Sequence, residues 1–314
     1  MDELHLPSAI EKSQRILIAG AGGGFDVYAG LPIYERLRRL GKSVFLANLS
    51  FVPLGITKAQ PVTRALYAVE ATTDGPEAYF PERTLAQFLS QRGERVTVYA
   101  FEKLGVAPIR EGYAHLARSL DLDAIVVVDG GTDILLRGDE AGLGTPSEDM
   151  ASLAAVVATD VPTKVIACVG FGVDTYHGVC HANWLENVAA LIADGAFLGA
   201  TALLERMPEV RLYINAVNAA EMATRQWPSI VNGSIVSAIE GRFGDYHSNP
   251  RTQSSKLFIS PLMSLLWAFD LAAVGRRNLY LDRLAETQSI RDVHLAIEDF
   301  RETVKCRPWE PIPH

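Results

Sequence analysis

The sequence has few cysteines, no excess of basic residues and no long hydrophobic run. Its three cysteines, Cys168, Cys180 and Cys306, match neither a disulfide framework nor a paired C-x-x-C zinc ribbon. Lysine and arginine number 29 against 37 acidic residues, so the chain lacks the basic surplus that tracks a nucleic-acid backbone. The longest apolar runs, such as residues 262–269, fall well short of the roughly 20 residues that span a bilayer. We therefore expect neither nucleic acid nor a membrane as a partner.

What the sequence does contain is enough apolar residues, 48%, for a continuous core. Residues 1–15 include Asp2, Glu3 and Glu11 and no apolar stretch, so we expect no signal peptide and a cytoplasmic protein. The expected partner is a small-molecule substrate. The proline-rich segment at 307–313 leaves two alternatives open, docking on the body of the protein or on a sister subunit in a homo-oligomer.

Short apolar runs alternate with amphipathic segments over the first two-thirds of the chain. The runs that predict strands are residues 15–19, 43–48, 66–71, 96–101, 124–128 and 164–169. The segments that predict helices are residues 27–40, 82–91, 109–120, 147–158, with Ser147 as its N-cap, and 179–193. Strict alternation of strand and helix is typical of a parallel sheet covered on both faces. The predicted fold class is α/β, with a doubly wound, mostly parallel Rossmann-like sheet.

The strand signal weakens after about residue 198. Helical patterns follow at residues 210–224, 229–239, 261–274, 280–286 and 291–304. One further strand, at 256–260, is expected to rejoin the sheet. No linker rich in Pro, Gly or Ser separates the halves, so we expect a single α/β domain over residues 1–314, with a Rossmann-like core at 1–198 and a mainly helical extension at 199–314. Three tryptophans in amphipathic segments are expected in the core: Trp184, Trp227 and Trp267.

Ligands of open parallel sheets bind outside the carboxyl ends of the strands, so the loops that leave the strands are the first candidates for a site. The loop after the first strand contains Gly20, Gly22, Gly23, Gly24 and Asp26. Glycines let the backbone approach a ligand closely, and the amides that open the next helix favour an anion such as a pyrophosphate. We therefore predict a nucleotide or NAD-like ligand here, with a tight turn that binds nothing as the alternative.

The end of the second predicted strand bears on the identity of that ligand. A dinucleotide fingerprint places an acidic residue there to hold a ribose, whereas this chain has Asn48. Asparagine can bond to a ribose hydroxyl, but less selectively than a carboxylate. Asn48 is therefore a candidate ligand contact in a site that differs from a standard NAD dehydrogenase.

The second loop leaves the clearest strand, at 124–128, and contains Asp129, Gly130, Gly131, Thr132 and Asp133. Two carboxylates four residues apart on glycine-rich backbone could bind a metal, hold ribose hydroxyls or act as acid and base. We predict Asp129 and Asp133 as catalytic residues and the three residues between them as ligand contacts. The alternative is that Asp133 caps a short helix.

The third loop, residues 170–183, is the richest in reactive side chains, with Asp174, His177, Cys180 and His181. On one helical turn, Asp174, His177 and His181 could face a zinc-type ion. Gly178 interrupts that turn, and the pattern H-x-x-x-H lacks the glutamate of metalloproteases. We predict Asp174 and His177 as catalytic residues, with a divalent metal on the three side chains or a structural role as alternatives.

Two motifs carry family resemblances. The segment at 16–34, which includes the glycine loop, and the D-G-G-T-D at 129–133 resemble an uncharacterised microbial family, domain of unknown function 1152, over most of the chain and without an implied activity. More remotely, G-A-G at 20–22 followed by G-L-P at 30–32 is similar to the opening of sirtuins, whose Rossmann-like fold binds NAD and transfers its ADP-ribose. Deoxyhypusine synthases share that broad fold class. The sirtuin resemblance implies that the loop would hold the pyrophosphate and that His177 would be the base.

The function that these loops indicate is an enzyme that binds a nucleotide-type or phosphorylated small molecule and catalyses hydrolysis or group transfer, with NAD, ADP-ribose or N-glycosidic chemistry as candidates. Two alternatives stay open, a nucleotide-sensing protein without turnover and a metal-dependent hydrolase. Arg251 and Lys256 are phosphate candidates, in a loop at 240–256 that could close over the site. If one site exists, the three loops must meet at one edge of the sheet.

Overall fold

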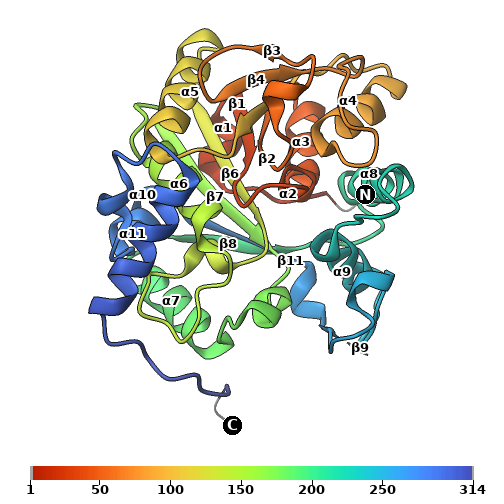
Figure 1. Cartoon of the computed structure of the whole chain (residues 1–314). Helices are drawn as coiled ribbons and strands as arrows, with labels where there is room; N and C mark the ends of the chain where they lie inside the picture. The colour runs from red at the N-terminus through yellow and green to blue at the C-terminus, as the bar shows by residue number, and fades with distance from the viewer. Residues whose placement is uncertain (1–2, 313–314) are drawn as a thin grey trace.

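The computed structural model describes residues 3–312 and is built around a large central sheet (Figure 1). The strands of this sheet are β1 (Arg15–Gly20), β2 (Ser43–Ser50), β3 (Gln60–Pro61), β4 (Leu66–Val69), β5 (Val98–Glu102), β6 (Ala124–Gly130), β7 (Thr163–Val169), β8 (Phe197–Ala202) and β11 (Leu265–Asp270). Within the described residues the sheet has nine strands, in the order β3-β4-β5-β2-β1-β6-β7-β11-β8.

The five central strands, from β5 to β7, all run parallel to one another. The strands on either side are antiparallel, since β4 pairs with β3 and β5, and β11 pairs with β7 and β8. The predicted doubly wound, mostly parallel α/β sheet is therefore confirmed. From β1 the chain proceeds outward through β2 to β5 and then returns to β6 on the other side of β1. The carboxyl ends of β1 and β6 thus form the switch point at which such sheets bind ligands.

Helices cover both faces of the sheet. They are α1 (Ser8–Lys12), α2 (Asp26–Ala29), α3 (Leu31–Arg39), α4 (Pro81–Gln91), α5 (Val106–Ser119), α6 (Pro146–Val157), α7 (His181–Ala193), α8 (Pro208–Ala223), α9 (Ile230–Ile239), α10 (Leu271–Arg277) and α11 (Ile290–Thr303). Figure 1 shows α6, α10 and α11 together on one side and α3, α4 and α8 on the other. Each group packs on its own hydrophobic cluster. Among residues 3–312, no helix is long and apolar enough to cross a membrane.

The central strands could be predicted from the sequence because they are buried on both faces of the sheet. All seven residues of β6 are buried, as are five of the six in β1. After Arg15, which begins β1, both strands consist of small or apolar residues until near their carboxyl ends. The polar residues begin where these two strands end. The fold therefore places the predicted loops at the switch point.

The structure corrects the prediction for residues 256–274. The helix expected at 261–274 was wrong, because this segment forms a 3₁₀ turn, then β11 between β7 and β8, and only then α10. A short apolar run such as that of β11 is compatible with a buried strand or a buried helix. The strand expected at 256–260 does not rejoin the main sheet. It shortens to β10 (Phe258–Ile259), which pairs with β9 (Gly244–Asp245) in a separate small sheet.

Smaller differences concern four predicted features. The helix expected at 27–40 is divided into α2 and α3 at Gly30, where a Cβ would lie 2.5 Å from Cγ2 of Ile18. Ser147 is not the N-cap of α6, because Thr145 holds that position. Trp227 is 51% exposed rather than a core residue. The boundary expected at 198 falls inside β8, so the second part of the chain supplies β11 and most of β8 to the main sheet.

Candidate functional site

A pocket of about 540 Å³ lies at the carboxyl ends of β1 and β6. All three predicted loops contribute to its lining, with Gly22, Gly23, Gly24, Asp26, Asp129, Gly130, Asp133, Asp174 and His177. The loops that strand alternation places at one sheet edge therefore do meet at one site. Of the residues predicted to bind a ligand, Gly20, Asn48, Gly131 and Thr132 do not line this pocket.

Hydrogen bonds from the buried side chain of Asn48 hold the glycine loop in its conformation. Gly23 and Gly24 have φ angles of 95° and 63°, in the left-handed region that favours glycine. The side-chain amide of Asn48 donates to the Gly24 carbonyl at 2.8 Å and to Oε1 of the buried Glu82 at 2.7 Å, and its oxygen accepts from the backbone N–H of Val27 at 3.3 Å. Asn48 therefore positions the loop, and its side chain is fully engaged away from the pocket.

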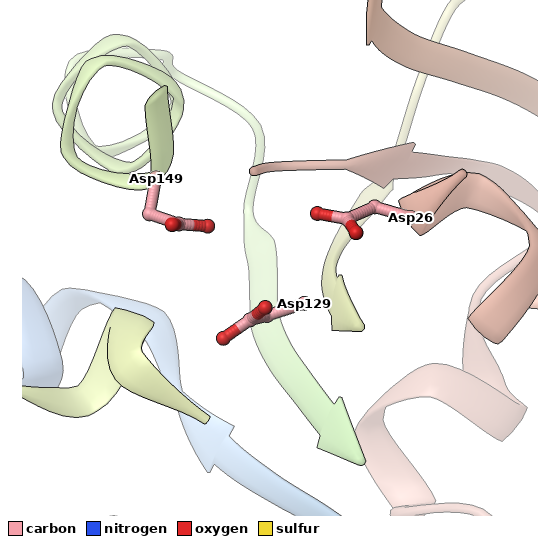
Figure 2. Close-up of side chains that lie close together, drawn as sticks. All are labelled: Asp26, Asp129 and Asp149. Atoms are coloured by element: carbon pink, nitrogen blue, oxygen red, sulfur yellow. The ribbon is translucent and has the colours of Figure 1, made fainter. Parts of the chain in front are cut away.

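Three aspartates bring their carboxylates together on the floor of the pocket. Asp26, Asp129 and Asp149 each have a carboxylate oxygen within 4.8 Å of one from both other residues, and Figure 2 shows the three side chains pointing toward a common space. The sequence pattern predicted Asp26 and Asp129 as site residues, but not Asp149. The three come from different elements, so only the fold brings them together.

Each of these aspartates is positioned by a local feature of the backbone. Asp26 opens α2, and its Oδ2 accepts a hydrogen bond from the backbone N–H of Gly22 at 2.6 Å. Asp129 lies near the end of β6, and its Oδ2 accepts from the N–H of Ile134 at 3.2 Å. Asp149 lies in the first turn of α6, a helix that is tied to the first loop because the hydroxyl of Ser152 donates to the Ala21 carbonyl at 2.9 Å.

Burial and mutual repulsion dominate the electrostatics of the floor. Burial is the largest cause that raises the pKa of Asp26 to about 7, and it raises the pKa values of Asp129 and Asp149 well above their ordinary range. The neighbouring aspartates raise these pKa values further, because each negative charge opposes ionisation of the next. The cluster therefore favours binding of protons or of another positive charge.

Asp133 and Asp174 line the pocket beside this cluster and are held by backbone donors. Oδ2 of Asp133 accepts from the N–H of Thr145 at 2.7 Å, and Oδ2 of Asp174 accepts from the N–H of Thr132 at 2.7 Å. Burial raises the pKa of both carboxyl groups, and the nearby His177 ring opposes this for Asp133. Thr132 is buried and links two neighbouring side chains, because its carbonyl also accepts a hydrogen bond from Nε1 of Trp184 at 2.8 Å.

The third loop does not form the metal site that its spacing suggested. His177 is exposed and lines the pocket, whereas His181 hydrogen-bonds to the hydroxyl of Thr175 at 2.7 Å and packs against Phe171. Gly172 and Gly178, with φ of 98° and 85°, enclose a 3₁₀ turn rather than a continuous helix. Among residues 3–312, the acidic or metal-ligating side chains that meet closely enough for one ion are the three aspartates, not Asp174, His177 and His181.

The rim of the pocket is cationic and aromatic. Arg251 and Lys256, the phosphate candidates, are both exposed and line the pocket, so the loop at 240–256 forms part of its wall. The guanidinium of Arg251 lies 5.5 Å from the ring centroid of Trp227 and donates to the Pro228 carbonyl at 2.8 Å. Phe51 and Tyr79 also line the pocket, next to the glycine loop. Sequence reasoning missed these aromatic residues, because isolated rings carry no pattern of their own.

Comparison with known proteins gives one finding. No curated protein and no solved structure matches the chain, so the remote resemblance to sirtuins is not confirmed. A family model matches residues 53–302, which include Asp129 and Asp149 but begin after the glycine loop and Asp26. That match covers most of the chain. The chain therefore belongs to the family described as "Protein of unknown function (DUF1152)".

Proposed function

We propose that this protein is an enzyme that binds a phosphorylated or nucleotide-type small molecule in the pocket and catalyses hydrolysis or group transfer. The observation that carries the proposal is the convergence of three strand-end loops on one pocket at the switch point of the sheet. The pocket's volume of about 540 Å³ lies in the range of small-molecule sites.

The rim supports a ligand that has both an anionic and a flat or apolar part. Arg251 and Lys256 offer two positive charges to a phosphate, and neither forms an ion pair with an acidic side chain among the described residues. The rings of Phe51, Tyr79 and Trp227 offer faces against which a base or a sugar can pack. This combination is what a nucleotide or a sugar phosphate requires.

The floor supports chemistry in addition to binding. Buried carboxylates with raised pKa values are costly to maintain, and such groups gather at active sites. We assign proton transfer to His177, because its ring is exposed at the pocket and histidine is the side chain that most often acts as a general acid or base. A sensor without turnover remains the competing function, and it has little need for these acids. The free state of all three cysteines supports our further proposal of a cytoplasmic enzyme.

A thermal-shift screen of nucleotides and sugar phosphates, followed by assays of turnover, tests this proposal, because a ligand that binds only the folded state raises its stability. We expect at least one phosphorylated compound to stabilise the protein. Lys256→Ala should weaken that binding by about tenfold, the loss of one charge-assisted hydrogen bond, whereas Lys305→Ala, a change of an exposed lysine in the C-terminal segment, should not. Failure of every phosphorylated compound, or equal binding by Lys256→Ala, contradicts the proposed ligand class. Binding without any turnover favours the sensor.

A further inference from the structure

The three carboxylates on the pocket floor are buried together without a basic partner. Asp26 is 9% exposed, Asp129 is 3% exposed and Asp149 is 1% exposed. Among the described residues, no lysine or arginine forms an ion pair with any of the three. Lys103, near the first turn of α6, is paired with Glu148. Ionised carboxylates in such surroundings need compensation by a positive charge, because burial removes the stabilisation that water gives them.

Asp149 supplies a second, independent observation. Its Oδ1 is fully buried and has no hydrogen-bond partner among the described residues. This oxygen faces the first loop, since a Cβ built on Gly22 would lie 2.9 Å from it. A buried carboxylate oxygen that has no protein partner is available to bind an ion or a water molecule.

The other two carboxylates are oriented as metal ligands usually are. One oxygen of Asp26 and one of Asp129 accept hydrogen bonds from backbone N–H groups, which fixes the direction of each carboxylate. The oxygens of the three residues approach within 4.8 Å of one another. Two oxygens on opposite sides of one cation are about 4–5 Å apart, so this spacing suits a single ion.

We propose that Asp26, Asp129 and Asp149 form a binding site for one divalent cation that prefers oxygen ligands, of the Mg²⁺ or Mn²⁺ class. The ligand set consists of carboxylates alone, which favours these hard cations over zinc. It replaces the set suggested by the spacing of Asp174, His177 and His181. The three ligands come from the glycine loop's helix, the end of β6 and the start of α6, so the cation would join three elements of the fold.

The role of the cation, though not its binding, rests on the proposed function. An acidic floor repels a phosphate, whereas a divalent cation bound there turns the same floor into a phosphate site. Mg²⁺ is commonly held by one or two carboxylates together with substrate phosphates. The cation would then hold a phosphate from the floor, and Arg251 and Lys256 would hold it from the rim.

Titration of the chelator-treated protein with Mn²⁺ alone, followed by isothermal calorimetry and by the electron paramagnetic resonance of free Mn²⁺, tests the site. We expect one Mn²⁺ per chain, with competition by Mg²⁺. Asp149→Asn and Asp129→Asn should each weaken Mn²⁺ binding by at least about tenfold, since even the loss of groups that only orient metal ligands costs that much. Asp160→Asn is the matched control. Asp160 is exposed and follows the C-terminal end of α6, so this variant should bind Mn²⁺ as the wild type does.

The outcomes separate this inference from the proposed function. Failure of Mn²⁺, Mg²⁺ and Ca²⁺ to bind, or wild-type binding by folded Asp149→Asn and Asp129→Asn, overturns the cation site even if a phosphorylated ligand binds. Circular dichroism establishes folding, and both changes remove a charge from a repulsive cluster, so we expect the variants to fold. Mn²⁺ binding that depends on Asp149 supports the site even if no phosphorylated ligand is found.

Discussion

Gly22 and Asp26 form one structural unit, because the backbone N–H of Gly22 donates to Oδ2 of Asp26 at 2.6 Å. A Cβ on Gly22 would lie 2.8 Å from that oxygen and 2.9 Å from Oδ1 of Asp149. Both distances are shorter than real contacts of a Cβ atom. A side chain at position 22 would therefore displace one or both of these carboxylates.

This contact predicts the effect of a single added methyl group. Gly22→Ala should push the loop away from Asp26 and Asp149, weaken Mn²⁺ binding by about tenfold or more, and destabilise the protein by about 1–3 kcal/mol through overpacking. Calorimetry with Mn²⁺ and unfolding by urea measure the two effects. Gly55→Ala, where a Cβ would meet nothing within 4 Å, is the control. Equal Mn²⁺ affinity in folded Gly22→Ala would show that the loop does not constrain the cluster.

His177 provides a test of chemistry that is separate from stability. His177→Ala should abolish most turnover of whichever phosphorylated substrate the screen identifies, while the free energy of unfolding changes by less than about 0.5 kcal/mol, because the side chain is exposed. His294→Ala, an exposed histidine of α11, is the control. Unchanged turnover in His177→Ala would remove this residue from the reaction and strengthen the case for a binding protein.

Asp129→Asn should raise the melting temperature of the metal-free protein and lower it, relative to the wild type, when a divalent cation is present. Burial and the neighbouring aspartates raise the pKa of Asp129 well above its ordinary range. At about pH 8, folding of the metal-free protein must therefore either bury this charge or take up a proton, and both oppose folding. The neutral variant should therefore melt about 2 °C or more above the wild type in the presence of a chelator. In Mn²⁺ the order should reverse, because only the wild type is stabilised by the ion. A chelator-treated variant that melts below the wild type contradicts this electrostatic account.

Glu82, which accepts a hydrogen bond from Asn48, should make the free energy of unfolding depend on pH. Burial raises its pKa from 4.5 to about 7, so between these pH values the folded state binds more protons than the unfolded state. The free energy of unfolding should therefore fall as the pH rises through this window. Glu82→Gln cannot ionise and should lose less stability, ending a few kcal/mol above the wild type at about pH 8, since each pH unit of pKa shift is about 1.4 kcal/mol.

Urea unfolding of the chelator-treated protein across that pH range provides the measurement. Glu111→Gln, a change of an exposed acid on α5, should leave the curve of the wild type unaltered. Parallel curves for Glu82→Gln and the wild type would mean that folding does not raise the pKa of Glu82.

The sequence was informative where burial on both faces enforces a simple pattern. Continuous apolar runs marked the five parallel strands, and their ends marked the loops that hold Asp26, Asp129 and His177. It was uninformative for β11, whose apolar run fits a helix equally well, and for β8, an edge strand with no fully buried residue. The segment of β11 becomes a strand because it pairs with β7, whose residues lie about a hundred positions earlier in the chain.

The site was predictable only as far as topology determines it. Asp149 was missed because acidic residues in the first turn of a helix are ordinary partners of the helix dipole. Its place in the site depends on the contact of α6 with the glycine loop, through Ser152 and Ala21. His181 shows the converse, since its spacing from His177 suggested a shared ion, but the turn between Gly172 and Gly178 directs it to Thr175.

The central claim, a cation on the acidic floor of a phosphate-binding pocket, is tested most directly by locating the ion. An anomalous difference map at the manganese absorption edge, from crystals grown with Mn²⁺, gives that location without reference to activity. The account predicts one strong peak bounded by Asp26, Asp129 and Asp149, and its loss in crystals of Asp149→Asn. A peak elsewhere in the pocket, or none at these three carboxylates, would contradict the account.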